Sequence, residues 1–69
     1  MKQTDRILKY MRDFGSITQL EAIRDLGCMR LAARIDDLKR DGHAIRREME
    51  TSKNRYGENI RYARYRLVE

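Results

Sequence analysis

The sequence has little of the chemistry that cross-links small proteins or makes them enzymes. Its 69 residues include one cysteine, Cys28, which excludes an internal disulfide bond and fits a reducing compartment. With a single histidine, His43, the chain also lacks the ligand set of a structural zinc site. It has no phosphate-binding glycine loop, and neither Cys28 nor His43 has a partner at a catalytic spacing. We therefore predict a protein that is not an enzyme, needs no cofactor and has no small-molecule ligand.

Long apolar runs, proline and internal repeats are missing as well. No stretch approaches the roughly 20 apolar residues that span a bilayer, and residues 1–5 lack the apolar region of a secretion signal. We therefore expect a protein that is not secreted, has no membrane partner and lies in the cytoplasm. The absence of repeats excludes a repeat architecture.

What the chain does have is a regular spacing of apolar residues. They make up 41% of the sequence, against 39% charged residues, and their clear periodicities argue against disorder. The length allows one domain, residues 1–69, with a thin core.

The first apolar segment has the spacing of a short helix. Thr4 or Asp5 is placed to cap its start, and Gly15 is placed to end it. The apolar face of this helix is expected to consist of Ile7, Leu8, Met11 and Phe14.

Two further helices follow with almost no connection between them. Thr18 and Glu21 have the spacing of a capping box at the start of the first, predicted over about 19–26, and Gly27 ends it. The other is predicted over about 29–40. The expected core positions of the pair are Ala22, Ile23, Leu26, Leu31, Ile35 and Leu38. Two short helices joined so tightly must cross steeply, which is the geometry of a helix-turn-helix.

From His43 onward the apolar period changes from about 3.6 residues to about 2, which indicates strands. Asn54 and Gly57 suit the first and last positions of a type I turn, so residues 55–57 are predicted to form a hairpin loop. Ile17 is placed to add a third short strand.

This loop length sets the register of the hairpin. It places Glu48 opposite Arg64 on the outer face as a pair of opposite charges. We expect Tyr65 in the core and Tyr62 over the outer face. The pairs expected on the inner face are Ile45 with Leu67 and Met49 with Ala63.

The predicted order, α-β-α-α-β-β, is that of an α+β winged helix-turn-helix, with three helices and a C-terminal β-hairpin wing. Five motifs stand out: GSIT (15–18), LGC (26–28), RLAARI (30–35) with DL (37–38), RYG (55–57) and RYRL (64–67). On these motifs, and over nearly its whole length, the chain resembles the small helix-turn-helix proteins of phages and prophages. The resemblance implies a DNA-binding role.

Positive charge gathers toward the hairpin. Of the net charge of +5, residues 43–69 carry +3, and residues 52–66 hold five basic side chains against Glu58 alone. A basic stripe is the footprint of a protein that binds a phosphate backbone, so we predict double-stranded DNA as the partner. The alternative is that the basic excess only keeps the protein soluble.

The third helix is the predicted recognition helix, because the second helix of such a pair enters the major groove with its N-terminal residues. Arg30 is the candidate base reader, since a guanidinium matches guanine O6 and N7. Ala33 is small enough to let the helix approach the DNA, and Met29 is placed to contact a thymine methyl group.

Charged residues further along this helix leave two interpretations open. Arg34 either reaches a phosphate or pairs with Asp37 or Glu21. Asp36 and Asp37 oppose DNA binding unless they lie at the end of the helix away from the groove.

Two other places complete the candidate DNA interface. Thr18 and Gln19 open the second helix, where free N–H groups and the helix dipole favour a phosphate, although Thr18 also caps the helix. The tip of the wing forms the other place, with Lys53, Asn54, Arg55 and Tyr56 facing backbone or minor groove.

Two other partners remain as alternatives. A protein-interaction module on the same scaffold would suit Asp36 and Asp37. A nonspecific RNA or single-strand binder would use the arginines and tyrosines of the sheet. No helix follows the hairpin to form a dimer interface, so we expect a monomer or a weak homodimer.

Overall fold

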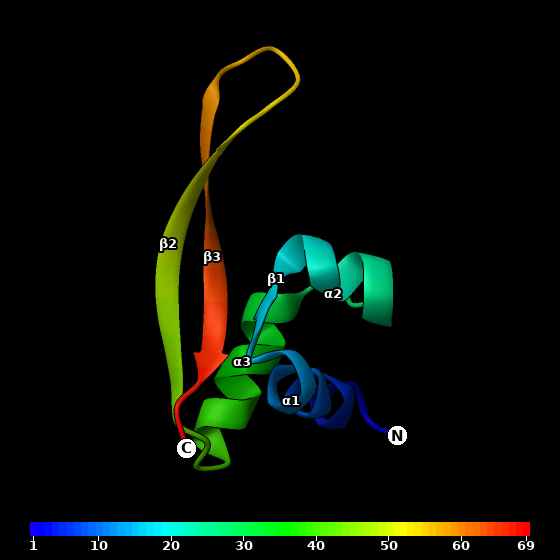
Figure 1. Cartoon of the computed structure of the whole chain (residues 1–69). Helices are drawn as coiled ribbons and strands as arrows, with labels where there is room; N and C mark the ends of the chain where they lie inside the picture. The colour runs from blue at the N-terminus through cyan, green and yellow to red at the C-terminus, as the bar shows by residue number, and fades with distance from the viewer.

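A computed structural model describes residues 1–69 and has the element order that the sequence predicts (Figure 1). In chain order the elements are α1 (Gln3–Phe14), β1 (Ser16–Thr18), α2 (Gln19–Leu26), α3 (Leu31–Arg40), β2 (Ile45–Lys53) and β3 (Asn59–Leu67). The strands form an antiparallel sheet in the order β1-β3-β2, so the expected third strand is confirmed. None of the helices is both long and apolar enough to span a membrane.

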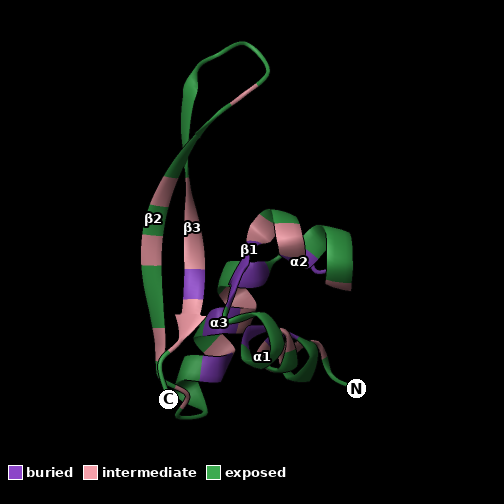
Figure 2. Ribbon diagram, in the orientation of Figure 1, coloured by how far each residue is buried: buried purple, intermediate pink, exposed green.

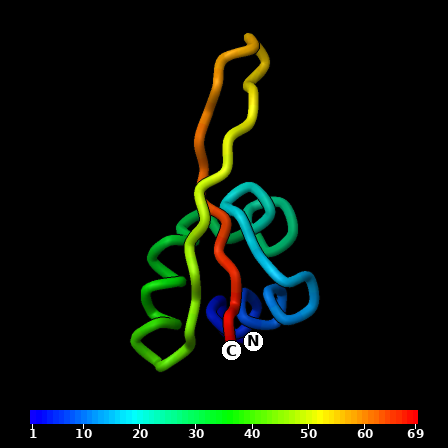
Figure 3. The backbone as a smooth tube through the Cα atoms, turned by 60° about the vertical axis from the view of Figure 1, so that its left-hand side comes forward, coloured from blue at the N-terminus to red at the C-terminus, as the bar shows by residue number.

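The helices gather beside the base of the sheet, and the β2–β3 hairpin extends beyond them (Figures 1 and 3). Both chain termini lie at the end of the molecule opposite the hairpin turn. The result is an elongated molecule with extents of 39 × 22 × 20 Å.

The predicted glycine ends of α1 and α2 and the predicted capping box of α2 are confirmed. Gly15 and Gly27 end these helices with φ values of 87° and 68°, a region that glycine enters without steric cost. At the start of α2, Thr18 Oγ1 accepts a hydrogen bond from the Glu21 N–H at 3.2 Å. Glu21 Oε1 in turn accepts one from the Thr18 N–H at 2.9 Å, which completes the capping box.

The start of α1 differs from the prediction. Its N-cap is Lys2, whose carbonyl accepts from the Arg6 N–H at 3.1 Å, and no side chain caps it. Thr4 and Asp5 therefore lie inside the first turn, and a cap at either residue is wrong. Asp5 still stabilises this turn, because a carboxylate interacts favourably with the positive end of the helix dipole.

The start of α3 also differs from the prediction, because a side chain of α2 binds the segment that precedes this helix. Gln19 donates from Nε2 to the Cys28 carbonyl at 2.8 Å and accepts at Oε1 from the Leu31 N–H at 2.9 Å. These bonds hold Met29 and Arg30 in the turn, and the helix begins at Leu31 instead of at residue 29.

The core lies where the helices meet β1 and the base of β3 (Figure 2). As predicted, it includes the inward positions of α3 and the ring of Tyr65. Its nine buried members are Ile7, Met11, Ile17, Ala22, Cys28, Leu31, Ile35, Leu38 and Tyr65.

Two residues of the helices that were predicted for the core lie at the surface instead. Phe14 is 71% exposed, because no other element covers the last residue of α1, and its ring packs on Tyr10 with 4.7 Å between the centroids. Ile23 is 41% exposed. It is turned about 100° from Ala22 around the helix axis, and an eight-residue helix presents only a narrow face to the core.

The hairpin turn and register are confirmed. The Gly57 N–H donates to the Asn54 carbonyl at 3.1 Å, and the Asn54 N–H donates to the Glu58 carbonyl at 3.0 Å. Met49, expected inside, is 47% exposed because the helices cover only the base of the hairpin. The strands pair Ile45 with Leu67, Met49 with Ala63 and Glu48 with Arg64.

We expect Met11→Ala to lower the free energy of unfolding by about 2–5 kcal/mol, because it leaves a cavity in the core. Phe14→Ala should cost about 1 kcal/mol or less, because it removes only an exposed ring pair. Urea denaturation of both variants measures the difference. Equal losses would show that Phe14 belongs to the core.

Candidate nucleic-acid interface

The residues around the start of α3 are accessible. Met29 is 71% exposed, and Arg30, also exposed, has no ion-pair partner. Ala33 is half-buried. Arg30 is the N-cap residue of α3 and lies just before the helix, with its guanidinium free to reach outward.

Further along α3 the charges are partly neutralised within the helix. Arg34 Nε lies 3.4 Å from an Asp37 oxygen, and Arg40 approaches the other oxygen at 3.7 Å. Of the two interpretations of Arg34, the structure therefore favours the pair with Asp37. Asp36 is exposed and has no ion-pair partner, so it is the carboxylate of α3 that still opposes a phosphate.

At the start of α2 the polar side chains are used within the protein. The Thr18 hydroxyl belongs to the capping box, and Thr18 as a whole is 5% exposed. The Gln19 amide bonds through Nε2 to Cys28 in the connection before α3, and through Oε1 to Leu31, the first residue of α3. These two residues hold the helix-turn-helix together, and their side chains have little freedom to reach a ligand.

The tip of the hairpin presents two of its four candidate residues freely. The side chain of Asn54 stabilises the turn, since its Oδ1 accepts hydrogen bonds from the N–H groups of Tyr56 and Glu58. Lys53 donates to Asn59 across the hairpin at 2.7 Å. Tyr56 is 83% exposed, and Arg55 is exposed without an ion-pair partner.

The outer face of the hairpin, which carries residues 46, 48, 50, 62, 64 and 66, neutralises most of its own charge, because two glutamates pair with its three arginines. Arg66 Nε donates to Glu48 at 2.9 Å, and Arg64 Nε donates to Glu50 at 2.8 Å. Each hydrogen bond lowers the pKa of its carboxyl group below the usual 4.5. Glu48 also forms an ion pair with Arg46, with 2.8 Å between Glu48 Oε1 and Arg46 Nη2.

Glu48 and Arg64 lie opposite each other, as predicted. The predicted charge pair between them is wrong, because Glu48 pairs with Arg66 and Arg64 pairs with Glu50. Each arginine reaches the carboxylate diagonally across the strands. Long side chains span this diagonal, and the twist of a two-stranded ribbon brings diagonal neighbours together.

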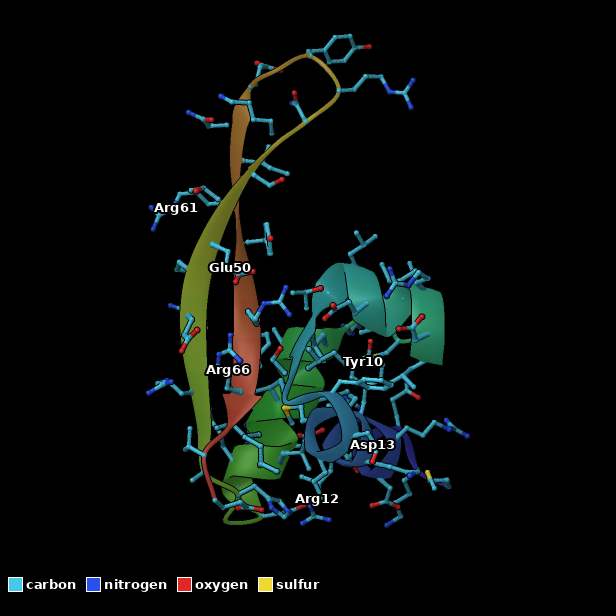
Figure 4. All side chains as sticks on the ribbon, in the orientation of Figure 1. Tyr10, Arg12, Asp13, Glu50, Arg61 and Arg66 are labelled. Carbon is cyan, nitrogen blue, oxygen red and sulfur yellow. The ribbon has the colours of Figure 1, made fainter.

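The inner face, on the side of the sheet that carries Tyr65, has cations without carboxylates. Arg47, Lys53 and Arg61 occupy its charged positions, all are exposed, and none forms an ion pair. Figure 4 shows Arg61 pointing outward from the hairpin on the side away from α2.

Arg47 and Arg61 were not among the residues that the sequence predicted for the interface. The signal that identifies them is the alternation along the strands. Odd positions from 45 to 53 and from 59 to 67 carry only positive charges, whereas the even positions carry Glu48 and Glu50. Sorting the charges by strand face, instead of counting them along the chain, separates the two groups.

Comparison with known families agrees with this architecture. The model of a family described as a winged helix-turn-helix domain matches residues 2–69. The chain belongs to this family. Comparisons with curated proteins and with solved structures gave no match. In the winged helix-turn-helix domain, α2 and α3 are the helix pair and the β2–β3 hairpin is the wing, and domains of this kind typically bind DNA.

The ion pairs of the wing predict a dependence of stability on pH. Because Arg66 and Arg64 lower the pKa of Glu48 and Glu50 in the folded state, both carboxylates release their protons more readily than in the unfolded chain. The resulting stabilisation is present above pH 4.5 and is lost as the pH falls through the lowered pKa values.

We therefore expect the unfolding free energy of the parent to fall more steeply below pH 4.5 than that of a Glu48→Gln/Glu50→Gln variant. Urea denaturation between about pH 6 and about pH 3 measures both slopes. Parallel slopes would show that these pairs do not shift the two pKa values.

Proposed function

We propose that this winged helix-turn-helix domain binds duplex DNA as a small regulatory protein of the phage or prophage kind. One observation carries the DNA-binding part. Of the eight basic side chains without an ion pair, five lie at the start of α3, at the wing tip and on the inner face of the wing, whereas the arginines of the outer face are all paired with carboxylates. The other three are Lys2, Arg6 and Lys39. The resemblance of the sequence motifs supports the regulatory role.

In the proposed complex the start of α3 enters the major groove. Arg30 reads a base edge, Met29 contacts an apolar base group, and the small side chain of Ala33 allows close approach. Arg34 combines its contact to Asp37 with an approach to the backbone.

The start of α2 and the wing approach the phosphate backbone. The side chains of Thr18 and Gln19 are bonded within the protein. These two residues therefore contribute by orienting the free N–H groups at the start of α2 toward a phosphate. The wing contacts backbone or minor groove with residues of its tip and of its inner face. These are Lys53, Asn54, Arg55 and Tyr56, to which we add Arg47 and Arg61.

We further propose that residues 1–69 act as a single domain in the cytoplasm, as a monomer or a weak homodimer. A protein-interaction role is the second candidate, and the unpaired carboxylate of Asp36 favours it. The sheet itself offers no stacking platform for single strands, since Tyr65 is 9% exposed and Tyr62 is half-buried.

Binding of a labelled duplex, followed by fluorescence anisotropy at increasing salt, tests the proposed function. If the four basic residues of the inner face and the tip each neutralise one phosphate, a fourfold rise in salt should weaken binding roughly 100-fold. Absence of measurable duplex affinity at low salt would refute DNA binding. Binding to a basic protein surface by a chain that has no affinity for duplex DNA would favour the interaction module.

Substitution of Arg30 and of Arg55 should weaken DNA binding in different ways. Arg30→Ala should cost about 1–3 kcal/mol on the preferred site and relax the preference at one base position. Arg55→Ala should weaken all duplexes nearly equally and lower the salt slope by roughly one. Selection from a random pool of duplexes supplies the preferred site.

Both side chains are exposed, so neither variant should change the unfolding free energy by more than about 0.5 kcal/mol. A folded Arg30→Ala variant that binds every sequence as well as the parent would show that the start of α3 is not the reading element.

A further inference from the structure

Arg64 of β3 connects three separate elements of the domain. Its Nε donates to Glu50 of β2 at 2.8 Å. Its Nη1 donates to Ser16 Oγ of β1 at 3.0 Å and lies 3.4 Å from Glu21 Oε1 of α2. The side chain is 21% exposed, the lowest value among the arginines that form ion pairs.

These contacts stand at the point where the wing leaves the body of the domain. Beyond it, residues 51–61 are exposed except for half-buried Asn54 (Figure 2). A groove of about 440 Å³ separates this part of the wing from the start of α2, with Leu20 and Ile60 among its lining residues. The outer half of the wing therefore has no packing of its own that would fix its direction.

The partner of Arg64 in α2 is also the residue whose side chain completes the capping box of that helix. Glu21 Oε1 accepts from the Thr18 N–H within the capping box and from Arg64. A change in the position of Arg64 is thus transmitted to the beginning of the helix-turn-helix pair.

We propose that Arg64 is a positioning residue that sets the direction of the wing relative to α2 and α3, and thereby the affinity for DNA, without contacting DNA itself. The effect on affinity rests on the proposed function, whereas the effect on wing direction does not. The planar guanidinium suits this role, because its donors point in several fixed directions. Two carboxylates, Glu50 and Glu21, surround the single positive charge, so the site repels a phosphate.

A charge-conserving substitution separates position from charge. Arg64→Lys keeps the positive charge but cannot reach all three partners, so the wing should spend only part of its time in the binding orientation. We expect duplex binding about three- to tenfold weaker with an unchanged salt slope, in proportion to the lost population. The matched control is Arg66→Lys, the same change on the same strand at an arginine that pairs only with Glu48 of β2 and does not connect to α2, which should alter binding by less than about twofold.

Removal of a carboxylate gives a test of sign. Taking a negative charge from a DNA-binding protein strengthens binding when the group acts only through its charge. Glu50→Ala should instead weaken binding by about three- to tenfold, because Arg64 loses its partner on β2. The control Glu58→Ala removes a carboxylate at the wing turn that forms no ion pair and accepts its side-chain hydrogen bond from Asn54, and this variant should bind as tightly as the parent or more tightly.

Residual dipolar couplings of the backbone amides test the wing direction without DNA. In the parent and in Arg66→Lys, a single alignment should fit both the helices and residues 51–61. In Arg64→Lys and Glu50→Ala, the alignment that fits the helices should fail for residues 51–61. A parent-like wing direction in both variants overturns the proposal, whatever their affinity. If the parent itself does not bind duplex DNA, the proposed function fails and the couplings alone decide the role of Arg64.

Discussion

The arrangement of the helices relative to the sheet depends on the carboxylate of Glu21, which joins α2 to β3. One of its oxygens accepts from the Thr18 backbone and starts α2, and the same oxygen lies within 3.4 Å of the Arg64 guanidinium in β3. The nine buried residues lie where the helices meet the base of the sheet, and none of them belongs to the outer half of the wing. The polar contacts around Glu21 therefore fix directions that the apolar core leaves open.

A second polar side chain has a comparable role between the two helices of the pair. Gln19 bonds to the Cys28 carbonyl and to the Leu31 N–H, and so satisfies backbone groups that the helix ends leave unpaired. The N-cap residue of α3, Arg30, cannot accept a hydrogen bond from these groups with its own side chain. Because Gln19 supplies the missing acceptor, Arg30 is left free to face outward.

The distribution of charge over the wing connects this architecture with the family to which the chain belongs. On the outer face the arginines are used to stabilise the hairpin, and their carboxylate partners make that face nearly neutral. On the inner face the cations have no such partners. A strand alternates its side chains between two faces, so one hairpin combines a structural surface with a basic one.

Much of the fold followed from the sequence itself, because the relevant signals are local. The Thr18–Glu21 capping box, the glycines at 15 and 27, and the Asn54–Gly57 turn each depend on residues a few positions apart. The length of the turn then set the strand register. Arg30 and Arg55 could likewise be placed in exposed positions from their neighbours along the chain.

Tertiary structure decided which residues are covered and which charges are left unpaired. Phe14, Ile23 and Met49 have suitable spacing for a core, but no element lies over them. Because Gln19 binds the Leu31 N–H, α3 begins at Leu31 and not at residue 29. Arg64 binds partners on β1, β2 and α2 instead of Glu48, which lies directly opposite it on β2. Such contacts join residues far apart in the chain, and neither apolar periodicity nor local charge spacing carries information about them.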